Sequence, residues 1–189
     1  LKLNSLGCDE CRARYRQDLL GYLEKNRSSL CPDCQRRLER NPLRVLDCKR
    51  EDCKKLVRSA PSPIDYLCSD CLRHFDGLKE LLGKLGISFQ IDQHLVRGLD
   101  YYTRTVFEFQ AKSGLGAQNT VCAGGRYDNL IHELGGPQTP AIGFALGMER
   151  LVILLKEKIP EEKLKLRPDL FLVFADRAGY DFAFGLLFS

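Results

Sequence analysis

The first part of the chain has apolar residues at the spacing of helices. In residues 12–25 every third or fourth position is apolar, which predicts a helix that buries one face. A second such pattern covers residues 62–86, with Ser62 or Asp65 as the expected cap and Gly86 as the expected end. The two apolar sets are Tyr15, Leu19, Tyr22 and Leu23 in the first helix, and Ile64, Leu67, Cys71, Leu72, Phe75, Leu78 and Leu82 in the second.

Strand patterns are rare before residue 87 and frequent after it. Alternating or continuous apolar runs occur at 43–47, 87–93, 95–112 and 118–123. In the third of these runs, Val106, Glu108 and Gln110 alternate with Phe107 and Phe109, as in a half-buried strand. We therefore expect a mainly helical beginning followed by a region of strands.

Glycines interrupt the next stretch of the chain. Residues 124–134 predict a glycine turn that leads into a short helix. Residues 139–158 predict a strand that breaks at Gly147 and continues as a helix. Strands and helices in this order indicate an antiparallel sheet with helices packed on it, which is an α+β fold.

The end of the chain has a different composition. Residues 159–168 are charged and contain two prolines, as linkers often do. Residues 169–176 predict an apolar strand and residues 177–187 a helix. The predicted organisation is a Cys-rich helical domain at 1–86, an α+β domain at 87–158, a linker at 159–168 and the start of an α/β domain at 169–189.

Composition places the chain among soluble globular proteins. It has 189 residues, of which 44% are hydrophobic and 29% charged, and no apolar run long enough to cross a membrane. The beginning has no signal-peptide layout, which predicts a cytoplasmic location without a membrane partner. The sequence has no initiator methionine and ends inside a predicted helix, so we expect a piece of a longer protein.

Basic charge is concentrated in the first third of the chain. Residues 1–74 contain 16 Lys and Arg against 11 Asp and Glu, whereas residues 75–189 contain 13 against 14. A basic surface favours a polyanionic partner, with phosphate as the obvious charged group. A solvated basic face without a partner explains the excess equally well.

Eight of the nine cysteines form close pairs: Cys8/Cys11, Cys31/Cys34, Cys48/Cys53 and Cys68/Cys71. The C-x-x-C spacing lets two thiolates reach one ion, and two pairs complete a tetrahedral zinc site. Chain proximity joins the first pair to the second and the third to the fourth, although an interleaved pairing is equally allowed. Disulfides, redox-active thiols and buried unliganded thiols are the alternatives. We expect the ninth, Cys122, to be a core residue.

Residues 95–102 combine an arginine, a glycine and two tyrosines at the start of a predicted strand. Arg97 follows two apolar residues, so we expect its guanidinium at the edge of the sheet, where its planar donors suit a phosphate or a carboxylate. Tyr101 and Tyr102 would point to opposite faces of a regular strand, unless a bulge at Gly98 changes the phase. A bulged edge strand is the simple alternative to a pocket for an anion and an aromatic group.

A second candidate stretch contains two adjacent glycines. At Gly124 and Gly125 the backbone can approach a ligand closely, and Arg126 and Tyr127 follow directly. The stretch matches neither a Walker loop nor a dinucleotide fingerprint. An ordinary turn is therefore the alternative.

A third candidate stretch lies at the predicted strand–helix junction. Gly147 precedes a helix whose first turn contains Arg150, and such a junction suits a flat ligand on which the guanidinium stacks. The alternative is a surface pair between Glu149 and Arg150. No nucleophile or carboxylate pair stands out, and the scattered histidines are interpreted as ordinary polar residues: His74, His94 and His132.

Three ordered stretches resemble the histidyl-tRNA synthetase family. "LVRGLDYYTRTVFEF" and "CAGGRYDNL" are similar to signature segments of that family, and "AIGFALGMERL" is similar to motif 3 of class II synthetases. Residues 1–86 resemble the insertion domain of bacterial forms, in a cysteine-rich variety. "RPDLFLVFAD" resembles the start of the anticodon-binding domain. The resemblance covers essentially the whole chain.

The resemblance implies a reaction and a role for each motif residue. Histidine is activated with ATP, bound with Mg²⁺, to histidyl-adenylate, and the histidyl group then passes to tRNA(His). Arg97 is the implied catalytic residue, because it would hold the histidine carboxylate and the α-phosphate. The implied histidine-binding residues are Arg97, Tyr101, Tyr102, Gly124 and Tyr127, and the implied ATP-binding residues are Gly147 and Arg150.

Part of the family pattern is missing from these residues. Motif 1, which builds the homodimer interface of the family, and motif 2, which supplies further ATP and histidine contacts, have no match. We therefore expect an incomplete active site that does not charge tRNA alone. The alternatives are a non-catalytic regulatory paralogue and a zinc-stabilised tRNA-binding module. Within the insertion domain, we hypothesise contact with the tRNA backbone through Arg36, Arg37 and Arg40.

Overall fold

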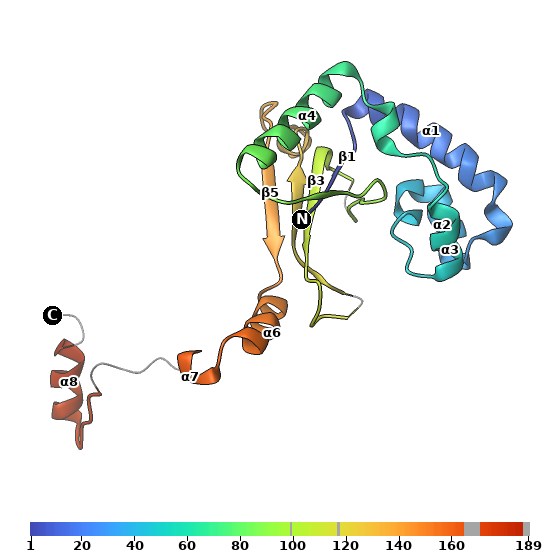
Figure 1. The fold of residues 1–189 in the computed structure, drawn as a ribbon. Coiled ribbons are helices and arrows are strands. Elements are labelled where there is room, and N and C mark those ends of the chain that lie inside the picture. The colour runs from blue at the N-terminus through green and yellow to red at the C-terminus, as the bar shows by residue number, and fades with distance from the viewer. Residues whose placement is uncertain (99, 117, 165–170, 187–189) are drawn as a thin grey trace.

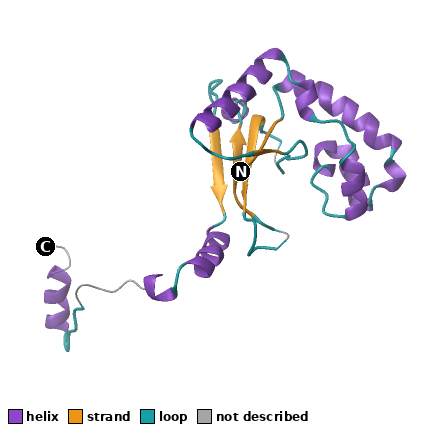
Figure 2. Cartoon of the chain, in the orientation of Figure 1, coloured by secondary structure: helices purple, strands orange, loops and turns teal. Residues whose placement is uncertain are grey.

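A five-stranded sheet forms the centre of the structure. The computed structural model describes residues 1–98, 100–116, 118–164 and 171–186. The strands, in the spatial order β2-β1-β3-β4-β5, are β1 (Lys2–Ser5), β2 (Gln90–Ile91), β3 (Thr103–Gln110), β4 (Thr120–Arg126) and β5 (Ile142–Leu146). Strand β1 pairs in parallel with β2, and the other neighbours pair antiparallel. The predicted α+β class with an antiparallel sheet is confirmed (Figure 2).

Helices from the first third of the chain form a group of their own beside the sheet (Figure 1). This group contains α1 (Asp9–Lys25), α2 (Pro32–Arg40) and α3 (Glu51–Val57), with the short 3₁₀ helices η1 (Arg27–Ser29), η2 (Pro42–Val45) and η3 (Pro63–Tyr66). Helix α4 (Ser69–Lys84) then runs back across one end of the sheet. The later helices are α5 (Leu130–Glu133), α6 (Met148–Lys158), α7 (Glu161–Leu164) and α8 (Arg177–Leu186).

Helix α1 follows the predicted apolar pattern. Tyr15, Leu19 and Leu23 are at most 1% exposed and form the centre of the core of the helical group. Asp9 and Glu10 lie in the first turn, where a negative charge interacts favourably with the positive end of the helix dipole. The helix predicted over residues 12–25 is therefore confirmed, and it begins a few residues earlier than the apolar pattern.

The helix predicted over residues 62–86 is divided in two. The Ser62 hydroxyl accepts a hydrogen bond from the Ile64 amide and so caps η3, not α4. Leu67 and Cys68 have extended backbone conformations that separate η3 from α4. The predicted end is correct, because Gly86 has a φ of +67° just after the last helical turn.

Strand β1 belongs to the sheet although its residues were assigned to the helical domain. The strand lacks the usual alternation of apolar and polar residues, because two of its fully buried residues, Asn4 and Ser5, are polar. The Asn4 side chain donates to the backbone carbonyl of Leu95 at 3.0 Å, which satisfies it inside the core. The strand predicted at 43–47 is wrong. Pro42–Val45 form η2, with Asn41 as the cap and Val45 pointing into the core.

The stretch that precedes β3 is a loop, so the predicted strand begins too early. Strand β3 starts at Thr103, and the described residues from 95 to 102 contain no strand. The predicted glycine turn is also wrong, because Gly124 and Gly125 lie inside β4. A Cβ at Gly125 would lie 2.6 Å from the Thr105 carbonyl oxygen and 2.8 Å from the Tyr102 ring. Close packing of the neighbouring strand and ring therefore explains this glycine.

Replacing Gly125 with alanine is expected to lower the free energy of unfolding by about 1–3 kcal/mol, the usual cost of overpacking. The matched control is Gly21→Ala, because Gly21 lies inside α1 with no atom within 4 Å of its added Cβ. That change should stabilise the protein by about 0.5–1 kcal/mol through helix propensity. Urea denaturation measures both, and an equal effect of the two changes would contradict the packing argument.

The end of the chain agrees with the sequence prediction only in part. Helix α8 occupies Arg177–Leu186 as expected, but the predicted strand is not formed by residues 171–176. The side chains of Phe171 and Val173 are 79% and 82% exposed, so they do not pack into a core among the described residues. The rest of this prediction, at 165–170 and 187–189, lies outside the described residues. Within the described part of the chain, no helix is both long and apolar enough to span a membrane.

Candidate active site and metal centres

A cavity of about 780 Å³ lies where the sheet meets the helical group. Six cationic side chains and three carboxylates line it: Lys2, Lys49, Lys54, Arg58, Arg97 and Arg150 against Asp47, Asp92 and Glu108. The cationic residues come both from the sheet region and from the segment around α3. The cavity therefore suits an anionic ligand that contacts both parts of the molecule.

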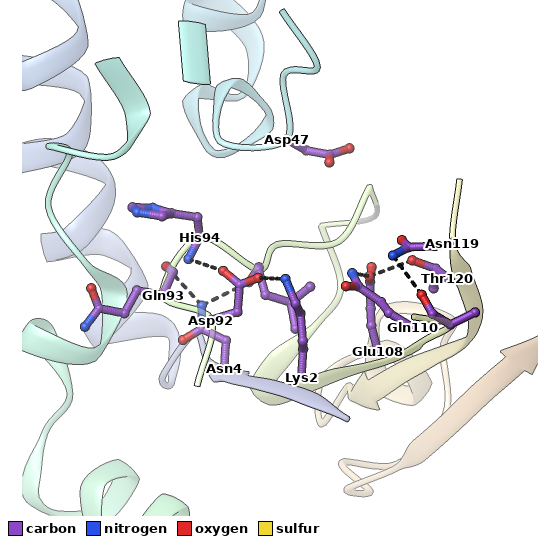
Figure 3. A network of polar contacts seen from close by, with 12 residues as sticks. Lys2, Asn4, Asp47, Asp92, Gln93, His94, Glu108, Gln110, Asn119 and Thr120 are labelled. Carbon is purple, nitrogen blue, oxygen red and sulfur yellow. Dashed lines mark hydrogen bonds and ion pairs between the residues drawn. The ribbon is translucent and has the colours of Figure 1, made fainter. Parts of the chain in front are cut away.

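Arg97 and Glu108 form the centre of this cavity. An Nη atom of Arg97 makes an ion pair with Glu108, whose side chain is 12% exposed. Glu108 also accepts hydrogen bonds from Gln110 and from the Thr120 hydroxyl, each at 2.8 Å (Figure 3). The Nε of Arg97 is buried and has no hydrogen-bond partner among the described residues. Glu108 thus holds one end of the guanidinium, while the buried Nε makes no hydrogen bond among the described residues.

Arg150 reaches the same network from the start of α6. Gly147 is the N-terminal cap of that helix, so the predicted junction of strand and helix is confirmed. Arg150 donates to the Thr120 carbonyl oxygen at 2.5 Å and to the Gln118 side chain at 3.1 Å. Arg150 therefore bonds residues 118 and 120 and does not form the surface ion pair with Glu149 that the sequence offered as the alternative. Thr120 therefore connects both arginines, through its hydroxyl to Glu108 and through its carbonyl to Arg150.

Asp92 also lines the cavity and connects Lys2 in β1 with the loop before Arg97. The Lys2 ammonium lies 2.8 Å from an Asp92 carboxylate oxygen, and the His94 amide donates to the other oxygen at 3.1 Å. Figure 3 shows Lys2 between Asp92 and Glu108. The loop before Arg97 is thus tied to the first strand of the sheet.

Replacing Glu108 with alanine is expected to lower the free energy of unfolding by about 2–3 kcal/mol. The change would leave the partly buried guanidinium of Arg97 without its counter-charge, and removing one partner of such a pair is costly. Urea denaturation of the protein measures the effect. Glu51→Ala is the control, because it removes only an exposed ion pair with Lys54 and one favourable charge in the first turn of α3, so its effect should be much smaller. Equal stability of the two variants would contradict this account of the pair.

The predicted tyrosines gather in one aromatic cluster. Ring centroids are 4.7 Å apart for Tyr101 and Tyr102, and 5.6 Å and 6.2 Å from these rings to Tyr127. The two adjacent tyrosines therefore do not point to opposite faces, since they lie in a loop. A hydrogen bond with Tyr102, followed by burial, raises the pKa of the Tyr101 hydroxyl.

The tyrosine cluster and the cavity are separate features of the described residues. Gly124 and Gly125 lie beside the cluster in β4, and Tyr127 packs so close to Gly143 that a Cβ there would be 2.2 Å from its hydroxyl. None of the three tyrosines is among the residues that line the cavity of Arg97. The structure thus places the predicted arginines in the cavity and the predicted tyrosines in a neighbouring cluster, with Arg97 close enough for its charge to act on the Tyr101 hydroxyl.

The eight paired cysteines form two clusters of four. Cys8 and Cys11 meet Cys68 and Cys71, and the other cluster consists of Cys31, Cys34, Cys48 and Cys53. The pairing expected from chain proximity is therefore wrong. The first pair along the chain, Cys8/Cys11, meets the fourth, Cys68/Cys71, and the two pairs that lie between them in the sequence meet each other. All eight are free thiols, so the disulfide alternative is not adopted.

The geometry of both clusters fits a tetrahedral ion. Zinc with four thiolates at about 2.3 Å requires sulfur–sulfur distances of roughly 3.8 Å. The Cys8 and Cys11 sulfurs are 3.5 Å apart, and those of Cys31 and Cys48 are 4.0 Å apart. All ligand atoms in each cluster lie within 4.8 Å of one another. The donor set and the distances therefore suit Zn²⁺.

Backbone amides point at the sulfurs, as they do around structural metal ligands. The Cys68 amide donates to the Cys11 sulfur at 3.1 Å, and the Cys31 amide donates to the Cys53 sulfur at 3.3 Å. The amide and thiol of Cys71 lower the pKa of the Cys68 thiol to about 7. Burial raises the pKa of Cys71 to about 12. Each cluster thus contains a sulfur that accepts a backbone hydrogen bond from a cysteine of the same cluster.

The remaining predicted residues lie outside these sites. Cys122 is buried in β4, as expected. His74 contacts the Arg126 guanidinium at 3.1 Å, and burial together with the charges of Arg126 and Arg104 lowers its pKa. The residues named for tRNA contact are spread along α2, where Arg36 pairs with Asp33 and Arg37 donates to the Arg44 carbonyl.

Comparison with known proteins places these features in a family. The sequence profile described as histidyl-tRNA synthetase matches residues 40–151, which is more than half of the chain. The chain belongs to the histidyl-tRNA synthetase family. The matched range contains Arg97, Glu108, the tyrosine cluster and Arg150.

Relatives and solved structures of the histidyl-tRNA synthetase family agree with this assignment. The histidine–tRNA ligase of Acetivibrio thermocellus is 53% identical over 95% of this chain and 43% of its own length. That of Syntrophotalea carbinolica is 52% identical over 100% of the chain and 44% of its own. The apo S. aureus histidyl-tRNA synthetase superposes with a TM-score of 0.64 at 34% identity, covering 98% of this chain and 45% of that one. The chain therefore spans less than half the length of the relatives it matches.

Glu108 is the site residue that sequence reasoning missed. Its position in β3 alternates with Phe107 and Phe109, on the same side as the buried Val106. A carboxylate at an inward position of a strand is costly unless it is paired, so the alternation itself contained a signal. The alternation by itself predicts a half-buried strand and does not indicate which residue pairs with Glu108.

Proposed function

We propose that the chain forms part of a histidine–tRNA ligase, which activates histidine with ATP and transfers it to tRNA(His). The observation that carries the proposal is Arg97. Its buried Nε has no partner among the described residues, whereas Glu108 holds another nitrogen, in a cavity that also contains Arg150. Such a site would suit an anion, and membership of the family supports the reacting carboxylate and phosphate as that anion.

In the activation step, a carboxylate oxygen of histidine attacks the α-phosphorus of ATP. A new phosphorus–oxygen bond forms, and the bond to the β-phosphate breaks to release pyrophosphate. Arg97 donates to oxygens that gain negative charge during this displacement, and Glu108 keeps its guanidinium in place beforehand. ATP enters with Mg²⁺ as part of the substrate. Arg150 and Gly147 would hold the nucleotide at the start of α6, with the guanidinium over the adenine.

Histidine recognition is proposed for the tyrosine cluster. Tyr101, Tyr102 and Tyr127 would surround the imidazole beside β4. Gly124 would contribute only through its backbone, because Gly143 and Phe144 fill the space that its side chain would occupy. A hydroxyl that bonds an imidazole nitrogen discriminates strongly against side chains without such a nitrogen, because it would otherwise remain unpaired. In the second step, a ribose hydroxyl of the terminal adenosine attacks the acyl carbon and AMP leaves.

Each cluster of four cysteines is proposed to hold one structural Zn²⁺. The residues are Cys8, Cys11, Cys68 and Cys71 in the outer site, and Cys31, Cys34, Cys48 and Cys53 in the inner site. A bound ion would cross-link the starts of α1 and α4 in the outer site, and the starts of α2 and α3 in the inner site. We also propose that the full-length protein works as a cytoplasmic homodimer and that the helical group contacts tRNA through Arg36, Arg37 and Arg40.

The test is histidine-dependent exchange of pyrophosphate into ATP by the full-length protein that contains this chain. Exchange is expected with histidine and with none of the other amino acids. Charging of tRNA(His) transcripts tests the second step. A folded full-length protein that binds Zn²⁺ but supports no exchange with histidine would instead be a non-catalytic paralogue.

A further inference from the structure

The outer cysteine site closes the base of the helical group. Cys8 and Cys11 lie at the start of α1, and Cys68 and Cys71 lie at the start of α4. The two ends of the helical group therefore meet at one point, next to the sheet. An ion bound there would determine how α1 is oriented relative to the sheet.

Arg12, the residue after Cys11, reaches from this site to the tyrosine cluster. Its Nη1 donates to the backbone carbonyl oxygen of Tyr102 at 2.7 Å, although the two residues are 90 positions apart. Asp9, in the same first turn, accepts a hydrogen bond from Asn129 at 2.8 Å, two residues after Tyr127. The beginning of α1 thus contacts the backbone of Tyr102 and a side chain two residues after Tyr127.

The backbone beside Tyr102 is strained, and the same segment holds it in place. Arg104 has a φ of +49°, a left-handed conformation that is unfavourable for a residue other than glycine. It lies where the pairing of β3 with β4 shifts register. The Arg104 amide donates to Gly7 at 2.8 Å, and its carbonyl accepts from Leu6 at 2.7 Å.

Gly7 connects that strained backbone to the cysteines. It has a φ of +73°, and a Cβ at this position would lie 2.3 Å from the Cys11 Cβ. The chain can therefore turn from β1 into the cysteine site only with a glycine here. One continuous segment, from Leu6 to Arg12, contacts both the strained residue and Tyr102.

We propose that metal bound at the outer cysteine site positions Tyr101 and Tyr102, in the loop before β3, for binding histidine. The metal would act through the segment from Leu6 to Arg12. The inference rests on the proposed function. Arg12 is a positioning residue, since it contacts the backbone of Tyr102. The inner cysteine site lies among α2 and α3, away from these contacts, and so stabilises the helical group without this effect on histidine.

The experiment measures histidine affinity and bound Zn²⁺ in the full-length protein. Arg12→Ala should raise the Kd for histidine roughly tenfold while both Zn²⁺ ions remain, because a hydrogen bond from a charged donor is lost. Arg14→Ala is the matched control, because Arg14 lies on the same helix and contacts Tyr66 rather than Tyr102. It should leave the Kd unchanged, and the KM for ATP should stay near the wild-type value in both variants.

Loss of the ion should reproduce the effect of Arg12→Ala. Cys68→Ser should lose one equivalent of Zn²⁺ and raise the Kd for histidine to a similar extent. The double variant Arg12→Ala/Cys68→Ser should bind histidine no more weakly than either single variant, because both changes act through the same contact with Tyr102. Cys53→Ser should also lose one equivalent but raise the Kd less.

Two results would overturn the proposal. One is an unchanged Kd in Arg12→Ala with both ions bound, which decides the question even if Cys68→Ser does not fold. The other is an equal rise in Kd for Cys68→Ser and Cys53→Ser, which would indicate general destabilisation. A wild-type protein that does not bind histidine would contradict the proposed function itself, and the positioning role with it.

Discussion

Replacing Arg97 with alanine in the full-length protein is expected to slow histidine activation by about 10²–10³-fold, the usual effect of removing one group that stabilises developing charge. The guanidinium is positioned before the substrate arrives, because Glu108 holds one nitrogen while Nε remains buried without a partner among the described residues. Alanine cannot replace either its charge or its donors. Histidine-dependent pyrophosphate exchange measures the rate.

Two further variants separate catalysis from stability at this position. Arg97→Lys keeps the charge but loses the planar pair of donors, so its rate should lie between those of the wild type and the alanine variant. In Arg97→Ala the carboxylate of Glu108 stays buried without its partner, which destabilises the fold. The double change with Glu108→Gln removes that penalty, and the rate should still remain low. Recovery of the wild-type rate in the double variant would show that Arg97 acts only on stability.

The elements with a strong local signal were predictable from the sequence. Helix α1 has an uninterrupted apolar period, and the break between β5 and α6 at Gly147 is marked by glycine itself. Strand β1 was not predictable, because its buried positions include Asn4 and Ser5. These side chains are satisfied by backbone atoms that lie far along the chain, such as the Leu95 carbonyl. No local pattern contains that information.

The pairing of the cysteines failed for a general physical reason. The entropic cost of closing a loop grows only with the logarithm of its length, so nearness in sequence is a weak guide to which pairs meet. The long return from Cys11 to Cys68 is instead determined by helices that pack together around Tyr15 and Leu19. The spacing within each pair predicts ligands for a metal ion, and the structure does bring the cysteines together in two groups of four, but the partner of each pair depends on the tertiary fold.

The candidate site was predictable as a set of residues but not as an arrangement. Motif resemblance identified Arg97 and Arg150, and the structure connects them through Glu108 and Thr120. It was the loop conformation before β3 that brought Tyr101 and Tyr102 onto the same side. That conformation depends on the left-handed Arg104, which only its contacts with distant residues stabilise.

Removing Zn²⁺ is expected to unfold the helical group while the sheet remains folded. If each cluster binds Zn²⁺ as proposed, each ion would contribute on the order of 10 kcal/mol to folding, which is comparable to the whole stability of a typical domain. Helices α2 and α3 are 9 and 7 residues long, too short to be stable by themselves. Four of the side chains that should form their core are cysteines of the inner cluster.

Hydrogen exchange with and without a strong chelator measures this effect in segments. Amides of α1, α2 and α3 should lose their protection after chelation, whereas those of β3 and β4, which pair with each other along their length, should keep most of theirs. Addition of Zn²⁺ should restore protection, and Mg²⁺ should not, because it prefers oxygen ligands. Protection of α1–α3 that is the same with and without chelator, in protein shown by elemental analysis to be free of metal, would mean that the thiols alone hold the helical group together. The strained backbone at Arg104, in β3, should then also be unaffected by the metal, since its hydrogen bonds are made with Leu6 and Gly7 of the same segment.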